Sequence, residues 1–107
     1  MLTLPIKKKW FDMIKSGEKK EEYREIKPYY TIRFDNITYQ YFKDNNGNIL
    51  LNHVDYFELI FRNGYKKDSP SIKCKVQLFK GYGKPEWGAE PNKLYYVLKI
   101  LSVGEVC

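Results

Sequence analysis

The sequence is poor in cysteine and histidine, with only Cys74, Cys107 and His53 among its 107 residues. Small secreted domains held by disulfides carry more cysteines at closer spacing, so a disulfide framework is excluded. There is no Cys-x-x-Cys pair and no second histidine, and we therefore expect no metal and no other cofactor. Cys74 falls on the apolar side of an alternating segment and is expected to be a buried thiol, whereas Cys107 is given no role.

Long apolar runs are also missing. No stretch approaches the roughly 20 residues that are needed to span a bilayer. Lys7, Lys8 and Lys9 come before any apolar run of the kind that a signal peptide contains. Together with the few cysteines, this pattern predicts a reducing, cytoplasmic location and no membrane partner. No repeat or low-complexity linker divides the chain, so we expect residues 1–107 to form a single domain.

Positive charge is present in excess, because Lys and Arg outnumber Asp and Glu by 19 to 13 and give a net charge of +6. Such an excess favours polyanionic partners such as nucleic acids. It is equally typical of a small domain that merely stays soluble, so charge alone leaves both interpretations open. Ten tyrosines contribute to an aromatic content of 17%, and their amphipathic rings suit both sheet faces and cleft walls.

Periodicity predicts one helix near the N-terminus. Pro5 suits its first turn, where the missing N–H donor is not needed, and Gly17 suits its end. We therefore expect a helix over residues 5–16. The residues that recur at helical spacing and would share its buried face are Ile6, Trp10, Met13 and Ile14.

Short alternating or apolar segments predict five or six strands. They cover residues 1–4, 19–26, 37–43, 54–61, 72–78 and 94–103. The segment 94–103 is apolar on both faces and is expected to be a central strand, while 44–48 forms a turn around Asn46-Gly47. Residues 28–34 form a helical turn or an irregular aromatic segment. The fold class is therefore mainly β (α+β): a small β-barrel with the N-terminal helix packed against it.

The segment from Gly17 to Arg24 is too polar for an ordinary strand. Glu22 and Arg24 point to the same side of a strand, and Lys19 lies just after the Gly17 turn. A strand that is charged on both faces is either a solvated sheet edge or the wall of a polar cleft. Arg offers a planar fork of donors and Lys a mobile positive charge, so both can bind a phosphate or a base edge. Alternatively, Lys19 and Arg24 pair with Glu21 and Glu22 in a purely structural role.

This segment resembles the signature of the ASCH domain, a member of the PUA-like superfamily. That signature is a helix ending in Gly-x-Lys-x-x-x-x-Arg, often with Glu two residues before the Arg, and Gly17, Lys19, Glu22 and Arg24 fill its positions. The later segments 61–65 and 83–88 resemble a small branch from phage and bacterial genomes. The resemblance covers nearly the whole chain.

The resemblance implies a PUA-like barrel with a basic cleft beside the first helix, and RNA or a nucleoside as the partner. Lys19, Glu22 and Arg24 would line the cleft floor. Tyr29 and Tyr30 would stack on unpaired bases, or pack in the core instead. The function that we expect is that of an RNA-binding module.

An enzymatic branch of the same superfamily hydrolyses the amide of N4-acetylcytidine with a Lys, a Thr and a Glu. Lys19 matches that Lys, but Glu22 stands where the Thr is expected, so the triad is incomplete. A small hydrolase acting on RNA or a modified nucleoside, with Lys19 and Glu22 as the catalytic pair, is the alternative function. Glu58 is a further candidate for the carboxylate if it faces inward, and an ordinary surface acid if it faces outward.

A third alternative is a protein-interaction domain in which the polar motif is only structural. Trp87 has two open interpretations, in the core or in the cleft. The basic clusters at 7–9 and 66–67, with Lys73 and Lys75, are typical of solvated faces, and they would extend an RNA-binding surface if they lie on the cleft side. The sequence leaves the oligomeric state open.

Overall fold

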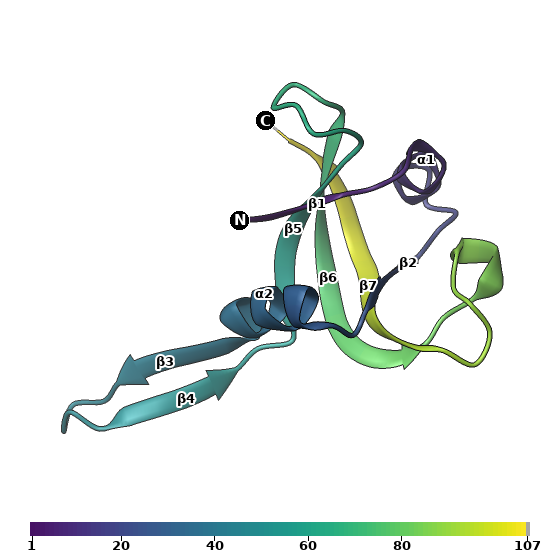
Figure 1. Ribbon diagram of the computed structural model, residues 1–107. Coiled ribbons are helices and arrows are strands. Elements are labelled where there is room, and N and C mark those ends of the chain that lie inside the picture. Colours follow the sequence, from purple (N-terminus) through teal and green to yellow (C-terminus); the bar gives the residue numbers. More distant parts are fainter. Residues whose placement is uncertain (107) are drawn as a thin grey trace.

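The chain forms a curled five-stranded sheet with two helices on its concave side and a two-stranded ribbon that extends from it (Figure 1). This computed structural model describes residues 1–106, so Cys107 lies outside the described residues. The helices are α1 (Lys8–Lys15) and α2 (Pro28–Thr38), and a short 3₁₀ turn, η1, spans Pro85–Trp87. The strands are β1 (Leu2–Pro5), β2 (Glu21–Glu25), β3 (Tyr39–Lys43), β4 (Ile49–His53), β5 (Tyr56–Arg62), β6 (Ser71–Tyr82) and β7 (Leu94–Glu105).

The large sheet has the strand order β1-β5-β6-β7-β2. Strands β1 and β5 are parallel and the other neighbours are antiparallel. The two long strands β6 and β7 are paired along almost their whole length, with a bulge between Lys75 and Val76. A bulge increases local twist, which helps the sheet to curl. The result is a half-barrel whose two edges are β1 and β2.

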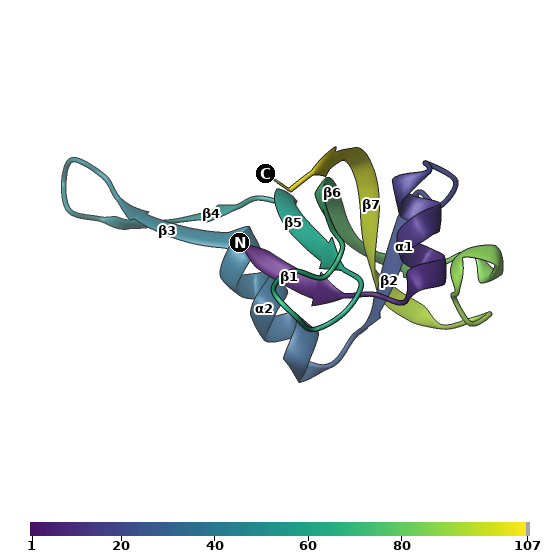
Figure 2. The same cartoon turned by 90° about the horizontal axis from the view of Figure 1, so that it is seen from above.

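Both helices pack against the inner face of this half-barrel (Figure 2). Phe11 and Ile14 from α1 and Phe34 from α2 join one core with the inner side chains of the strands. Those strand residues alternate as expected and include Leu59, Phe61, Ile72, Cys74, Val76, Tyr96 and Leu98. Cys74 is fully buried, as the alternating pattern predicts, and burial raises the pKa of its thiol to about 12.

A second, smaller core lies on the outer face, where the segment 83–93 folds over β2 and β7. Tyr95 and Val97 pack there with Tyr23 and Ala89. This covering loop explains why 94–98 is apolar on both faces, since Tyr96 and Leu98 face the inner core while their neighbours face the outer one. The strand lies inside the sheet, between β6 and β2, as its composition predicts.

The predicted mainly β fold is confirmed, and the differences are local. The first helix begins at Lys8 rather than at Pro5, because Pro5 is still paired with Arg62 in the sheet and Lys7 has an extended backbone. It ends as predicted, with Gly17 at a φ of +86° that glycine adopts without strain. Of the two alternatives for residues 28–34, the helical one is correct, and the segment is the first part of the longer helix α2, which Pro28 begins at a first-turn position.

The barrel is open, and the strand predicted at 37–43 is not part of it. That strand appears as β3 and pairs with β4, which the sequence analysis missed, to form a separate ribbon. The segment 49–53 shows no polar–apolar alternation, because three consecutive apolar residues, 49–51, are followed by Asn52 and His53. Every residue in both strands is exposed. Among the described residues, no helix has the length and apolar character needed to cross a membrane.

Candidate functional site

The edge strand β2 presents its charged residues to the inside of the half-barrel. Its register on β7 sets Glu22 opposite Leu98 and Arg24 opposite Tyr96, and both of those partners face the inner core. Tyr23 points the other way, into the outer core. The two interpretations of this polar segment are therefore both met: β2 is a sheet edge, and its inner face borders a polar hollow.

Glu22 stands at the centre of a buried ionic cluster. Its Oε1 lies 3.3 Å from Nζ of Lys19, and its Oε2 accepts a hydrogen bond of 2.9 Å from Nη2 of Arg24. The three side chains are 0%, 9% and 10% exposed in the order Lys19, Glu22 and Arg24. One carboxylate thus offsets two buried cations, which leaves the cluster with a net positive charge. Lys19 and Arg24 pair with Glu22, whereas Glu21 accepts a hydrogen bond from Tyr23 on the other face.

Arg24 joins the two edges of the half-barrel. Its Nη2 also donates to the carbonyl oxygen of Pro5 at 2.8 Å, and its Nη1 donates to the hydroxyl of Tyr30 at 3.2 Å. Pro5 ends the edge strand β1 and Tyr30 belongs to α2. A single guanidinium therefore connects β2, β1 and α2 where the sheet does not close.

Lys19 lies behind this pair and does not line the pocket, whereas the resemblance implies a place for it on the cleft floor. Its Nζ donates to the carbonyl oxygen of Trp87 and lies 4.8 Å and 4.9 Å from the ring centroids of Trp10 and Tyr23. Aromatic faces attract a cation most strongly where water is excluded. Burial lowers the pKa of Lys19, while the adjacent Glu22 carboxylate opposes that change.

The covering loop is fixed to the back of the cluster through Tyr23. The Tyr23 hydroxyl donates to Oε1 of Glu21 and accepts from the backbone N–H of Lys84. Gly83 makes this close approach possible, because a Cβ at that position would lie 2.6 Å from both the Tyr23 ring and Ala89. Burial raises the pKa of Tyr23 above the ordinary tyrosine range, so its hydroxyl stays protonated and keeps donating.

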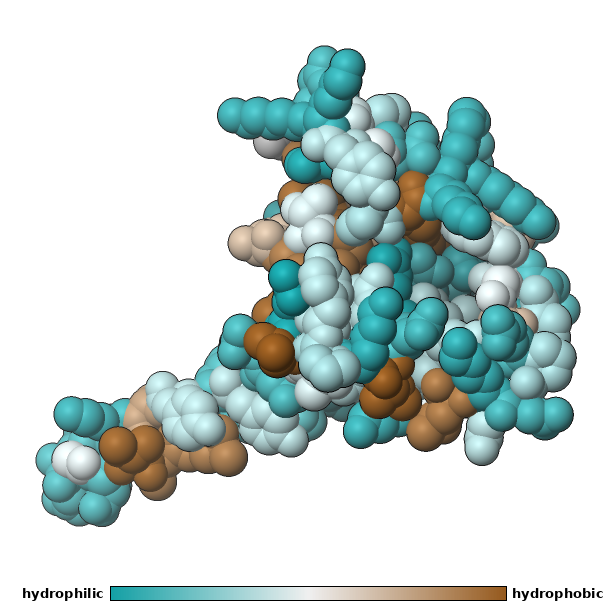
Figure 3. All heavy atoms as spheres, viewed as in Figure 1, coloured by the Kyte–Doolittle hydropathy of each residue, from teal (hydrophilic) through white to brown (hydrophobic). Residues whose placement is uncertain are grey.

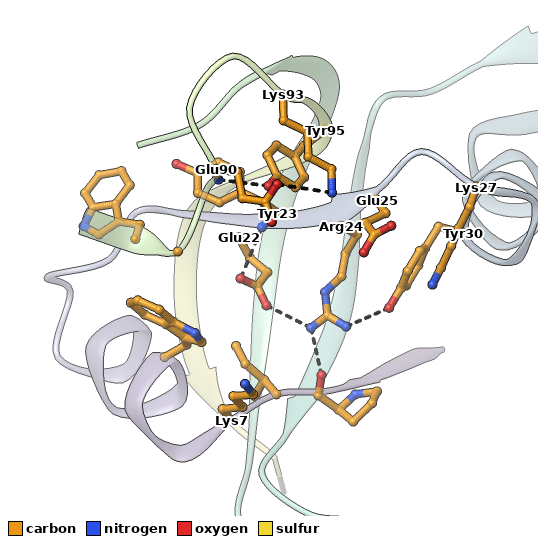
Figure 4. Close-up of a pocket in the computed structure, with 15 residues that line it drawn as sticks. Lys7, Glu22, Tyr23, Arg24, Glu25, Lys27, Tyr30, Glu90, Lys93 and Tyr95 are labelled. Atoms are coloured by element: carbon orange, nitrogen blue, oxygen red, sulfur yellow. Dashed lines mark hydrogen bonds and ion pairs between the residues drawn. The ribbon is translucent and has the colours of Figure 1, made fainter. Parts of the chain in front are cut away.

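In front of the cluster lies an open pocket of about 430 Å³ between β2, the start of α1 and the covering loop. Figure 4 shows Glu22 and Arg24 side by side at its base, with Tyr30, Lys27 and Lys7 around them. Five aromatic residues line it, namely Trp10, Tyr23, Tyr30, Trp87 and Tyr95. Its charged lining consists of Lys7, Arg24, Lys27 and Lys93 together with Glu22, Glu25 and Glu90. Cations therefore exceed carboxylates by one, four against three.

The structure gathers only some of the predicted site residues. Glu22, Arg24 and Tyr30 line the pocket, and Lys19 supports Glu22 from behind. Tyr29 lies outside, half exposed, with its ring under the guanidinium of Arg33. Glu58 faces outward on β5 and pairs with Lys73 at 3.3 Å, so it is the surface acid of the two interpretations. Trp87 meets both of its interpretations, because it packs on the outer core and lines the pocket.

Several lining residues were not identified from the sequence. Trp10 was assigned to the buried face of the first helix, but it also forms one wall of the pocket. Lys27 and Lys93 lie in segments without a motif, and the fold alone brings them together. Trp10 precedes the charged strand in the sequence and Tyr30 follows it. This arrangement of aromatic residues around the motif is the sequence signal that could have indicated the pocket walls.

Among residues 1–106, no three His, Cys, Asp or Glu side chains gather in an arrangement that suits a metal ion. A comparison with protein-family models, with curated proteins and with solved structures finds no match to this chain.

The buried cluster generates a prediction about stability. Replacing Glu22 by Gln removes the one carboxylate that pairs with Lys19 among residues 1–106 and leaves two buried cations uncompensated. We expect the free energy of unfolding to fall by about 3 kcal/mol. Urea denaturation followed by circular dichroism measures it. Asp12→Asn is the matched control, because it breaks the exposed Lys8–Asp12 pair with the same chemical change and is expected to cost less than about 0.5 kcal/mol. Equal losses in the two variants would contradict the central role of Glu22.

The lowered pKa of Lys19 predicts a particular pH dependence. As pH rises from this lowered pKa toward the ordinary value of 10.5, the folded chain releases the proton before the unfolded chain does. The unfolded state then holds more protons, so stability from this group increases with pH across that window. We expect the native protein to gain stability relative to Lys19→Met as pH rises, in parallel denaturation curves. A difference that shrinks or reverses with rising pH would show that the pKa of Lys19 is not lowered.

Proposed function

We propose that this chain binds single-stranded RNA by accepting an unpaired nucleotide in the pocket in front of Glu22 and Arg24. The observation that carries the proposal is that one open pocket combines aromatic walls with the Arg24–Glu22 ion pair on its floor. A volume of about 430 Å³ lies within the range of small-ligand pockets, roughly 300–1,000 Å³. The resemblance of the segment from Gly17 to Arg24 to ASCH domains supports the same proposal.

The base of the pocket has hydrogen-bonding capacity to spare. Within the described residues, Arg24 uses three of its five N–H donors, toward Pro5, Glu22 and Tyr30. Two donors are left for the acceptor atoms of a base edge or a phosphate. Oε2 of Glu22 accepts from Arg24 and keeps a lone pair for a base amino group, whereas Oε1 already faces Lys19 and the backbone N–H of Tyr23. A fixed donor group beside a fixed acceptor group suits the edges of nucleobases, which carry both.

The walls and the rim of the pocket suit the other two parts of a nucleotide. Trp10, Trp87 and Tyr30 line the pocket, and aromatic rings are groups on which an unpaired base can stack. Lys7 and Lys27 are exposed at the rim, where an ammonium group can meet a phosphate. Stacking is tolerant of sequence, so specificity in this arrangement comes from Arg24 and Glu22.

A neighbouring hollow favours a polymer over a free nucleoside. This second hollow, of about 320 Å³, shares Pro5, Ile6 and Lys7 with the first and is completed by Asn63, Gly64 and Tyr65. Asn63 holds its loop in place by donating to the carbonyl oxygen of Ile6 at 3.0 Å. Tyr65 is 90% exposed and precedes Lys66 and Lys67, which form one of the basic clusters noted in the sequence. A second base can stack on Tyr65 while the phosphate between the two nucleotides meets Lys7.

Hydrolysis of a modified nucleoside, the alternative that the resemblance implies, requires Nζ of Lys19 to reach the substrate. That atom is fully buried between two aromatic rings and is bonded to Glu22 and the Trp87 carbonyl oxygen. Glu22 stands between it and the open pocket. This geometry favours a positioning role for Lys19, so we propose binding without chemistry.

The proposal predicts that charge at the rim matters more than charge elsewhere. We expect Lys7→Glu/Lys27→Glu to weaken binding of a fluorescent single-stranded RNA of about eight nucleotides by more than 10-fold, as measured by anisotropy at physiological salt. The matched control is Lys75→Glu/Lys99→Glu, which changes net charge equally at exposed positions away from the pocket. Equal losses in both variants would reduce the interaction to nonspecific attraction, and no binding by the native protein would refute the proposal.

The second hollow predicts an effect that depends on RNA length. Replacing Tyr65 by Ala removes a stacking surface and is expected to lower affinity for the same RNA by about 10-fold. Binding of a single nucleotide, followed by NMR chemical shifts of pocket residues, is expected to stay unchanged. Tyr82→Ala, another exposed tyrosine outside both hollows, is the control. An unchanged affinity for the RNA in Tyr65→Ala would limit the ligand to the first pocket.

A further inference from the structure

The ribbon formed by β3 and β4 stands away from the body of the molecule (Figure 1). It follows α2 without a break and is fixed at its root by a hydrogen bond of 2.7 Å from Val54 N to Thr38 O. The extended ribbon contributes to a radius of gyration of 15.3 Å, against about 13 Å for a compact chain of this length. We call residues 39–53 the arm.

One face of the arm is apolar. The register sets Tyr39 opposite His53, Tyr41 opposite Leu51 and Lys43 opposite Ile49, and alternation brings these six side chains to the same face. Tyr41 is 72% exposed and Ile49 is 70% exposed. The other face carries the polar pair Gln40 and Asn52 beside Phe42 and Leu50. Figure 3 shows these hydrophobic residues gathered along the arm, without a covering layer.

The turn of the arm is held by side-chain hydrogen bonds, although both faces of the arm are exposed. Oδ1 of Asp44 accepts hydrogen bonds of 2.9 Å from the backbone N–H groups of Asn46 and Asn48. These bonds lower the pKa of the Asp44 carboxyl and fix the strand register. An isolated two-stranded ribbon is only marginally stable in water, however, and a large apolar face on it marks a contact site. The local sequence therefore shapes an arm whose stability requires a partner.

The charge of the arm narrows the choice of partner. Lys43 and Asp44 are its only Lys, Arg, Asp or Glu residues, so its net charge is zero and the whole +6 lies on the rest of the chain. A neutral arm does not attract a polyanion or an anionic membrane. Two copies of the chain repel each other through their basic bodies, and the arm is a large neutral surface at a distance from them.

The area of the apolar face also fits a second copy. Its four apolar side chains, with the stems of Lys43 and His53, expose on the order of 500 Å². Two such faces in contact bury on the order of 1,000 Å², which is about the lower limit for a specific interface. A contact between identical faces is self-complementary and closes with two-fold symmetry.

We propose that two copies of this chain associate through the face of the arm that carries Tyr39, Tyr41, Ile49 and Leu51. The bodies then lie at opposite ends of the paired arms. The pockets stay open, because none of their lining residues lies within the arm. Each copy in the dimer presents its own pair of hollows to the ligand, and dimer formation does not depend on what these hollows bind.

Sedimentation velocity of the full chain, over concentrations from about 1 to about 500 μM, tests the proposal. We expect the native protein to shift from monomer to dimer as concentration rises. Tyr41→Lys/Leu51→Lys places two cations at directly opposed positions of the apolar face and is expected to stay monomeric. Gln40→Lys/Asn52→Lys does the same on the other face and is expected to dimerise like the native protein. Circular dichroism checks that the body of each variant remains folded.

Three outcomes would overturn the proposal. The first is that the native protein stays monomeric at the highest concentration, in which case the arm would contact a different protein. The second is that the Tyr41→Lys/Leu51→Lys variant dimerises as well as the native protein, which would place the interface elsewhere. The third is that both variants lose the dimer equally, which would show that the effect is not specific to the apolar face.

Discussion

The carboxylate of Glu22 is the group on which the rest of the structure depends. Its two oxygens bind the side chains of Lys19 and Arg24, and each of these cations then binds a main-chain carbonyl oxygen elsewhere in the chain. Burying an unpaired charge is costly, so neither cation can stay where it is without this carboxylate. Through them, one side chain on an edge strand holds β1, the covering loop and α2 around the same point.

This arrangement also solves a problem of the half-barrel. A sheet that does not close leaves two edges with free backbone groups. Here Arg24 from one edge strand bonds the carbonyl oxygen of Pro5 at the end of the other, and the helices fill the concave side between them. The gap between the edges is therefore not simply packed shut. It remains as a pocket whose floor is polar, whose walls are aromatic and whose rim carries lysines beside Glu25 and Glu90.

The sequence predicts this molecule best where burial leaves a pattern. The alternation in β5 and β6 identifies the core residues, and Gly17 marks the end of the first helix, because one face of each element is buried. The same reasoning predicts that Glu22 and Arg24 share a face. It does not place Lys19, since a buried lysine is held there by Trp10, Tyr23 and the Trp87 carbonyl oxygen, which come together only in the folded chain. It misses β4 for a different reason, because the consecutive apolar residues 49–51 give no polar–apolar alternation to detect.

The choice of acceptors in the ionic cluster has a consequence for how such a site can change. Arg24 and Lys19 reach the main chain at Pro5 and Trp87, not the side chains of these residues. Every amino acid supplies the same carbonyl oxygen, so side chains at these two positions can be exchanged without removing the bonds that hold the frame. Because Pro5 and Trp87 also line the pocket, substitutions there can change ligand preference while these two main-chain hydrogen bonds are retained. In each of these residues the main-chain oxygen holds the ionic cluster in place, and the side chain is the part that can change what the pocket binds.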